Sequence, residues 1–303
     1  MKRMTATYFP ILFSILFLFC TNTKQTKKGT TTESLAKKIG KHEKFNSYWY
    51  QGKAEITSYE LSQNRYGEIR TGRAVNIFVT EDFLPEKQVK ADYKNDKNIS
   101  ILKLNTTRKF ITGIYPYSIM TSTFTPIPMN QNSIKISYSS QEWCGNTFVQ
   151  LNNRENFEVN FHSYFESNAD KSFTIQKNIL ENELWNQLRI NPKDLPVGTL
   201  NIIPSFEYLN LHHKEIKAYT AKVTLQEKEN YLVYTLNYPE LNRVLTIKAE
   251  NNFPFIIDSW DEIFSKNGRQ YKNSAKKIKT ILSAYWSEKG DKGIALRKEL
   301  GLK

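Results

Sequence analysis

Residues 232–247 read LVYTLNYPELNRVLTI, and their pattern carries most of the information about the fold of this 303-residue chain. Apolar and polar side chains alternate from Leu232 to Tyr238, and the alternation resumes at Leu245 and Ile247. A period of two is typical of a strand that buries one face and exposes the other. One-sided burial with short connections predicts an antiparallel sheet, because parallel sheets are usually covered on both faces.

The same alternation recurs on both sides of that stretch. It is present at 75–79, 134–138 and 157–161, and turn-prone residues such as Asn152-Asn153 separate the alternating segments. No internal repeat and no second linker interrupts residues 46–303. We therefore predict one mainly β domain over 46–303, built as a curved antiparallel sheet that resembles half a barrel.

One amphipathic helix is expected to pack against this sheet. Leucines recur every four residues from 180 to 188, Asn178 stands where an N-cap is expected, and Pro192 follows the last apolar position. A second short helix is expected near residues 294–300. Residues 275–286 fit a helix and a strand equally well.

The first twenty residues form an apolar leader. Two basic residues precede an apolar run from Tyr8 to Phe19, which is too short to span a bilayer and is typical of a secretory signal. Cys20 follows, as in bacterial lipoproteins, where this cysteine becomes the lipid-bearing first residue. The usual small residue before the cysteine is replaced by Phe19, so an uncleaved short anchor is the alternative. We predict a signal or lipoprotein leader over 1–20, lipidation at Cys20, and attachment to the membrane in the periplasm or at the outer membrane.

Positive charge is concentrated beside this leader. Residues 1–50 contain nine Lys or Arg and two Glu, and so hold +7 of the formal net charge of +13. Residues 21–45 are rich in Lys, Thr and Gly, which predicts a basic flexible linker. Such a linker attracts anionic lipid head groups by about 1 kcal/mol per charge near the surface, although solubility alone explains it equally well. No nucleic-acid partner is expected, because that would require the charge on a folded face with stacking aromatic residues.

The composition and motifs exclude several classes of protein. Two cysteines exclude a disulfide scaffold, and 39% hydrophobic residues exclude a polytopic membrane protein. No GxGxxG, P-loop, HExxH or GxSxG motif occurs, so no cofactor is predicted. His213 and Glu215 could share a face, but a third ligand is not apparent, so no metal site is predicted.

Two groups of residues are candidates for hydrolytic chemistry. Cys144, in the string QEWCGN (141–146), lies one predicted hairpin away from His162, and the two could act as nucleophile and base. A small buried cysteine within a strand is the simpler interpretation. The acids at 258–262, around Trp260, could supply paired carboxylates for glycoside cleavage, or could form a solvated loop after a strand.

Four aromatic residues are candidates for ligand binding. Trp49 lies in the string SYWY, Tyr115 and Tyr117 lie in GIYPY, and Trp143 precedes Cys144. Exposed aromatic rings can stack on sugars or line an apolar channel. Core packing and cross-strand pairing are the alternative roles, because aromatic residues in strands usually serve them.

Several strings resemble those of a family of uncharacterised exported proteins from Bacteroidetes-type bacteria. They are YWYQGKAEI (48–56), GIYPYSIMTSTF (113–124), QEWCGN (141–146), HSYFES (162–167) and IPSFEY (203–208). The resemblance implies no known activity. Such sequences sometimes carry the label of a Maf-type septum formation inhibitor. Neither the Ser-x-Ser-Pro-Arg-Arg motif nor the alternating βα units of Maf proteins occurs here, so we do not expect that activity.

A looser likeness implies a function. The predicted helix LENELWNQLR (180–189), followed by the Leu-Pro-x-Gly turn at 195–198, is similar to the pattern of periplasmic half-barrel proteins of the LolA type. Those proteins hold a lipid chain on their concave face. We therefore expect a cell-envelope lipoprotein that binds an apolar or envelope-derived ligand without catalysis. The alternatives are a secreted hydrolase that uses Cys144 and His162, and a structural or protein-interaction module.

Overall fold

The structure is a computed structural model that describes residues 43–127, 131–166 and 168–302. Residues from Lys44 onward form one compact unit. Cys20, the leader and most of the predicted linker lie outside the described residues, so the signal and the lipidation stay predictions. Residues 43–49 are helical, so a helix begins before residue 45, where the predicted linker ends. None of the described helices is long and apolar enough to cross a membrane.

A single sheet of 16 strands forms the compact unit. The strands are β1 (Ala54–Arg65), β2 (Glu68–Leu84), β3 (Val89–Lys90), β4 (Ile99–Thr112), β5 (Tyr115–Pro126), β6 (Lys135–Glu142), β7 (Gly145–Asn153), β8 (Phe157–Ser163), β9 (Lys171–Ile175), β10 (Ile179–Leu180), β11 (Gly198–Ile203), β12 (Tyr219–Glu227), β13 (Tyr231–Tyr238), β14 (Arg243–Glu250), β15 (Ile257–Lys266) and β16 (Arg269–Ser283). Their order is β10-β11-β12-β13-β14-β15-β16-β1-β2-β4-β5-β6-β7-β8-β9, with β3 beside β2.

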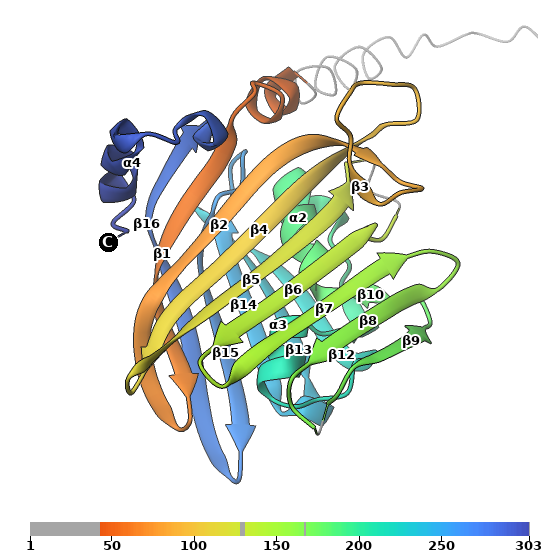
Figure 1. Ribbon diagram of the computed structural model, residues 1–303, viewed down its shortest axis with the longest axis vertical. Coiled ribbons are helices and arrows are strands. Elements are labelled where there is room, and N and C mark those ends of the chain that lie inside the picture. Colours follow the sequence, from red (N-terminus) through yellow and green to blue (C-terminus); the bar gives the residue numbers. More distant parts are fainter. Residues whose placement is uncertain (1–42, 128–130, 167, 303) are drawn as a thin grey trace, which may run out of the picture. The chain divides into compact units, whose positions relative to one another are not determined.

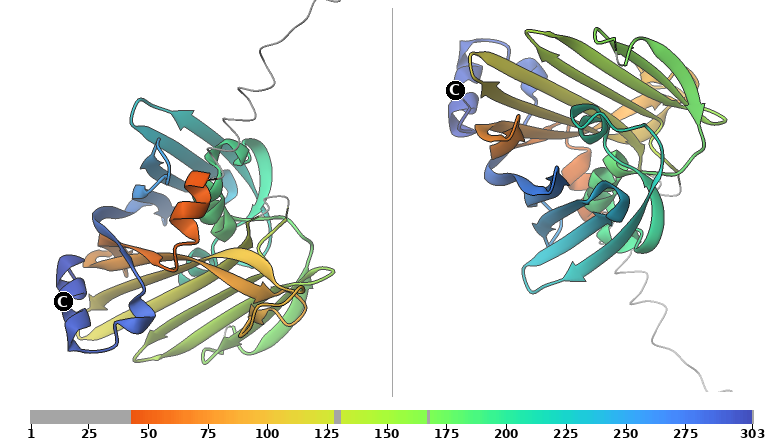
Figure 2. Two further views of the ribbon diagram at one scale, coloured as in Figure 1. Left: turned by 90° about the horizontal axis from the view of Figure 1, so that it is seen from above. Right: turned by 90° about the horizontal axis from the view of Figure 1, so that it is seen from below.

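The sheet is open, and it is antiparallel everywhere except at one edge. Only β10 and β11 pair in parallel, while all other described neighbours are antiparallel. The order ends at β9 and β10, which are the free edges of the described sheet. The sheet curves so that its two halves lie on either side of two short helices (Figures 1 and 2). The predicted mainly β fold with a curved sheet is therefore confirmed.

The alternation of side chains explains this curved arrangement. Leu232, Tyr234, Leu236 and Tyr238 of β13 are each at most 4% exposed, as their spacing predicts. The same parity holds along β14, where every second residue is buried. Tyr234, Leu236 and Tyr238 of β13, with the buried apolar residues of β14, join the main hydrophobic core, which lies on the concave side of the sheet together with the helices. In these two strands, burial of one face stabilises the fold, while the other face remains partly in water.

The observed helices match the predicted ones only in part. α2 (Glu181–Ile190) is the predicted amphipathic helix, but Leu180 rather than Asn178 precedes its first turn. A second helix, the six-residue α3 (Phe206–Leu211), packs in the core beside the predicted one. The six residues of α3 are too few to show a helical period. Its start is marked by a cap, in which Ser205 accepts a hydrogen bond from the Tyr208 N–H.

The end of the chain covers part of the convex face. β16 ends at Ser283, which resolves the ambiguous segment as mainly strand, and α4 (Ile294–Glu299) is the predicted short helix. Leu300 packs against Ile56 of β1 and Val79 of β2, on the face opposite the main core. The sheet is covered on both sides there, and this explains why the first six residues of β1 are all buried. Short 3₁₀ turns complete the fold: η1 (Pro192–Asp194), η2 (Pro239–Leu241), η3 (Tyr285–Ser287) and η4 (Asp291–Gly293).

Candidate functional site

The centre of the concave face is filled. α2, α3 and the inward side chains of the sheet leave a cavity of about 40 Å³, lined by polar groups that include Glu181, Arg243 and Glu262. One water molecule takes about 30 Å³, and ligand pockets usually measure about 300–1,000 Å³. The centre of the trough therefore has no room for the lipid chain that the LolA-type likeness implies.

An ion cluster occupies the core beside this small cavity. The Arg243 guanidinium donates to both carboxylate oxygens of Glu181 at 2.5 and 2.8 Å, and its Nε donates to Glu262 at 2.7 Å. Tyr238 donates a further hydrogen bond to Glu181, and Asn273 donates one to Glu262, both at 2.7 Å. The cluster joins the start of α2 to β14 and β15, so it holds the helix against the sheet.

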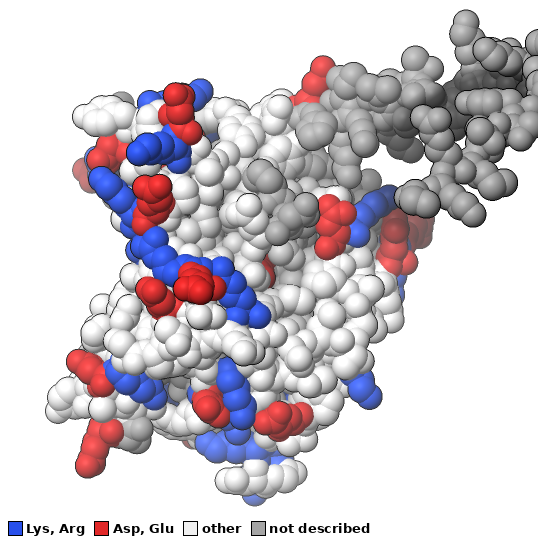
Figure 3. All heavy atoms as spheres, turned by 90° about the vertical axis from the view of Figure 1, so that its right-hand side faces the viewer, with Lys and Arg blue, Asp and Glu red and all other residues white. Residues whose placement is uncertain are grey.

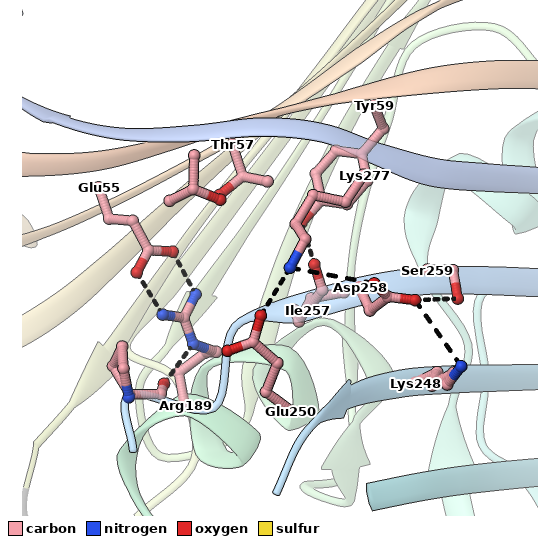
Figure 4. Close-up of polar contacts among 12 residues, drawn as sticks. Glu55, Thr57, Tyr59, Arg189, Lys248, Glu250, Ile257, Asp258, Ser259 and Lys277 are labelled. Atoms are coloured by element: carbon pink, nitrogen blue, oxygen red, sulfur yellow. Dashed lines mark hydrogen bonds and ion pairs between the residues drawn. The ribbon is translucent and has the colours of Figure 1, made fainter. Parts of the chain in front are cut away.

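A second buried ion pair ties α2 to β1 (Figure 4). The Arg189 guanidinium donates to the two oxygens of Glu55 at 2.6 and 2.5 Å, and both side chains are at most 1% exposed. Its Nε donates to the Pro254 carbonyl at 2.9 Å, and Tyr48 donates to Glu55 at 2.5 Å. The guanidinium also lies 4.5 Å from the centre of the Phe78 ring. Each guanidinium nitrogen of Arg189 and each carboxylate oxygen of Glu55 thus has a hydrogen-bond partner within the core.

The acids of the central cluster have pKa values that are shifted in opposite directions. Burial raises the pKa of Glu207, although Arg108 pairs with it at 2.8 Å. Burial on its own would raise the pKa of Glu262, but the charges of Arg243, His212 and Arg108 and the hydrogen bond from Asn273 together hold that pKa below its usual value. Burial lowers the pKa of His212 to about 4. Carboxyl groups with such different pKa values can serve as acid and base, but a cavity of about 40 Å³ admits no substrate to them.

The acids around Trp260 do not form a catalytic pair. Glu262 points into the core, while the neighbouring Asp261 is half exposed and pairs with Lys272 at 3.0 Å. Adjacent residues of a strand face opposite sides of the sheet, and β15 continues through both positions. The paired carboxylates that glycoside cleavage requires are therefore not assembled.

Cys144 and His162 lie at the surface and do not contact each other through any hydrogen bond of the described residues. Cys144 is exposed in the β6–β7 turn, and its hydrogen bond with Glu142 raises the pKa of the thiol. A reactive cysteine needs a lowered thiol pKa. His162 lies on β8, where it pairs with Asp170 at 3.5 Å and stacks on Phe148. The geometry gives the hydrolase alternative no assembled nucleophile and base.

Three of the four aromatic candidates gather at one end of the sheet. Tyr115 lies between Tyr117 and Trp143, with ring centres 5.9 and 6.4 Å away. Trp143 is 67% exposed, whereas Tyr117 is buried against the stacked ring of Phe110. Trp49, by contrast, is buried in the main core. It therefore has the packing role that the sequence left open as its alternative.

A large apolar groove lies on the convex side, between the sheet and the C-terminal segment. Its volume is about 1,210 Å³. Its floor is formed by residues of β1, β2, β4, β5 and β16, and its far wall by residues 285–302. The apolar residues that line it are Ile56, Val75, Ile77, Phe110, Ile111, Pro116, Tyr117, Ile281, Tyr285, Ile294, Leu296, Leu300 and Leu302. Ile111 and Ile294 are 61% and 59% exposed, so the walls offer apolar surface that the protein itself does not cover.

Two smaller openings lie at the turns that join the strands. A cleft of about 500 Å³ separates β7, β8 and β9 from α3, but its apolar walls, such as Val149, Phe206 and Leu209, are already buried in the core. A pocket of about 400 Å³ lies between the β1–β2 turn and the β15–β16 turn. Of these four openings, the convex groove offers the most uncovered apolar surface.

Sequence reasoning missed the groove because its walls come from six segments of the chain, β1, β2, β4, β5, β16 and residues 285–302. One local signal existed. The outward positions of β2 carry Val75 and Ile77, where a solvated sheet face would carry polar residues.

On the face shown in Figure 3, the described basic and acidic side chains are intermixed, so this face has no surface of a single charge sign.

Comparison with known proteins identifies no family. The sequence matches no protein-family model, and no curated protein is significantly similar to it. Among solved structures, a β-barrel-like protein of the domain of unknown function DUF1849 from Brucella abortus is similar over 76% of this chain and 98% of its own. The two sequences are 8% identical, and the TM-score is 0.38. At this distance the likeness indicates no shared activity. The resemblances to exported Bacteroidetes proteins and to the LolA type stay predictions.

Proposed function

We propose that this protein is a non-catalytic binding protein for an amphiphile, and that the apolar part of the ligand lies in the convex groove. The observation that carries the proposal is the groove itself, with about 1,210 Å³ of space and exposed apolar walls. A contiguous apolar surface of this kind on a soluble unit usually marks an interaction site. The class of ligand is the one expected from the sequence, but the proposed binding site lies on the convex face rather than the concave face.

The shape of the groove depends on the C-terminal segment. Arg73 of β2 donates through its Nε to the Gly301 carbonyl at 3.2 Å, which fixes the end of the chain to the sheet. Leu300 is 4% exposed and anchors α4 on Ile56. These two contacts attach the end of the chain to the sheet. The segment from η3 to α4 stands beside the open floor of the groove as its wall.

The charges along the groove favour an anionic head group. Arg73, Lys109 and Lys289 line it together with the acids Glu60 and Glu288. Lys109 and Lys289 make no ion pair within the described ranges, so both ammonium groups are free to meet a ligand. A fatty acid or another lipid with a negative head group would place its chain on the isoleucines and its head near these lysines.

The leader supports an envelope setting for this activity. An apolar run that ends at Cys20, followed by a basic linker, would tether the unit to a membrane from which amphiphiles can be taken. Lipidation at Cys20 and export to the periplasm or outer membrane, which the sequence predicts, are part of this proposal. Acylation of Cys20 is measurable by labelling cells with a clickable fatty acid, with Cys20→Ala as the unlabelled control.

Introducing a carboxylate into the groove is expected to weaken binding of a fatty acid. We predict that the double variant Ile111→Asp/Ile294→Asp binds the fluorescent fatty acid cis-parinaric acid about tenfold or more weakly, because each 1.4 kcal/mol of lost contact or added repulsion is tenfold. Both side chains are about 60% exposed. Such surface substitutions change stability by only about 0.5 kcal/mol each, so the fold should be retained.

Val197→Asp is the matched control for this experiment. Val197 is 56% exposed and precedes β11, away from the groove, so the same change there should leave probe affinity unaltered. Displacement of the probe by palmitate should follow the same order. Equal affinities in the unmodified protein and the double variant, with both folded, would remove the groove as the site.

A further inference from the structure

A second pocket opens where two long hairpins meet the end of α3. It measures about 400 Å³, and it is bounded by the β1–β2 turn at Arg65–Gly67, the β15–β16 turn at Lys266–Arg269, and residues 211–213. It shares no lining residue with the convex groove. Its occupant is therefore a separate question from that of the amphiphile.

The pocket is basic. Arg65, Lys266 and Arg269 line it, and none of its described lining residues is Asp or Glu. Arg65 is held in place by neutral acceptors only, at 3.1 Å from the Tyr117 hydroxyl and 3.0 Å from the Leu211 carbonyl. Lys266 and Arg269 make no ion pair with any residue that the structure describes. Three cations without a carboxylate around one cavity favour an anionic occupant.

The walls of the pocket are aromatic. Tyr66 is 62% exposed, and the Arg65 guanidinium lies 4.5 Å from the centre of its ring. On the opposite hairpin, the rings of Phe264 and Tyr271 stack with their centres 5.6 Å apart. Phe264 is 4% exposed, so Tyr66 and the half-buried Tyr271 are the rings that present apolar faces next to donors of hydrogen bonds, which suits the faces of a ring-shaped polar molecule.

The back of the pocket carries an unused acceptor. Gln63 is 2% exposed, and its Oε1 has no hydrogen-bond donor. Gln63 also lines the small central cavity, so the pocket and that cavity meet at this side chain. A buried amide oxygen without a donor is costly, and a hydroxyl group of an occupant would satisfy it.

We propose that this pocket binds an acidic sugar, a hydroxylated ring that carries a carboxylate or a phosphate. The anionic group lies among Arg65, Lys266 and Arg269. The ring lies between Tyr66 and the opposite aromatic pair, and one hydroxyl group donates to Gln63 Oε1. A simple inorganic anion uses only the cations, and a neutral sugar uses only the rings and Gln63, so both bind more weakly.

Calorimetric titration of the full-length protein tests this proposal. The probes are glucuronate and glucose 6-phosphate, with glucose and inorganic phosphate as the partial ligands. We expect at least one acidic sugar to saturate the protein, with an affinity about tenfold or more above that of either partial ligand. Tighter binding of glucuronate assigns a carboxylate to the site, and tighter binding of glucose 6-phosphate assigns a phosphate.

The variant Lys266→Gln/Arg269→Gln should weaken binding of the acidic sugar about tenfold. Lys222→Gln/Lys228→Gln removes the same charge from exposed positions of β12 and its following turn, and should leave affinity unchanged. Failure of both acidic sugars to saturate the unmodified protein overturns the proposal. It is also overturned if the Lys266→Gln/Arg269→Gln variant, with an unaltered circular dichroism spectrum, binds as tightly as the unmodified protein. Neither result bears on cis-parinaric acid binding, which reports on the other site.

Discussion

Replacing Arg243 with methionine is expected to lower the free energy of unfolding by about 3–5 kcal/mol, because one partner of a buried ion pair is removed. Glu181 and Glu262 are 1% and 8% exposed, and Arg243 is the only guanidinium that contacts both within the described structure. Methionine fills part of the volume but leaves two carboxylates without their cation. Urea denaturation followed by tryptophan fluorescence would measure the loss, and the midpoint of thermal unfolding should fall by about 10 °C.

Lys272→Met is the matched control. Lys272 pairs with Asp261 at 3.0 Å on the neighbouring pair of strands, but these side chains are 55% and 46% exposed. Exposed pairs contribute about 0–1 kcal/mol, so this variant should unfold almost as the unmodified protein does. Adding Glu181→Gln and Glu262→Gln to Arg243→Met should recover part of the lost stability. Equal losses for Arg243→Met and Lys272→Met would show that burial gives the cluster no special weight.

The sheet could be predicted from the sequence because its signal is local. In β13, each of the four inward side chains is apolar, and two residues of the strand suffice to fix which face is buried. α3 had no such signal, because six residues make fewer than two helical turns. Its burial depends on the two halves of the sheet meeting around it, which no short window of sequence contains.

The buried ion pairs were missed for a different reason. A charged residue at the start of a strand usually indicates exposure, and Arg243 and Glu55 both stand near strand starts. A signal was nevertheless present in β14. Arg243 shares its parity with Leu245, Ile247 and Ala249, which are all buried, so the alternation itself places the arginine on the inward face. What the sequence lacked was the identity of the partner, since Glu181 is 62 residues away along the chain.

Removing one member of the Arg189–Glu55 pair should also be costly. Glu55→Gln leaves the guanidinium of Arg189 without a negative partner in a site where both side chains are at most 1% exposed. We expect a loss of about 3–5 kcal/mol in the free energy of unfolding, measured by urea denaturation. Arg189→Met should cost a similar amount, because it leaves the Glu55 carboxylate with only the Tyr48 hydroxyl as a described side-chain donor.

The double variant Glu55→Leu/Arg189→Met separates the energy of the pair from the cost of breaking it. When both charges are replaced by apolar side chains of similar volume, no buried charge is left unpaired, and such replacements are often neutral or stabilising. Phe78 and Trp49, whose rings lie 4.5 and 5.2 Å from the guanidinium, supply apolar neighbours for the new side chains. The double variant should therefore be more stable than either Glu55→Gln or Arg189→Met. Strictly additive losses would instead mean that the two side chains act independently, and that α2 is held to β1 by packing alone.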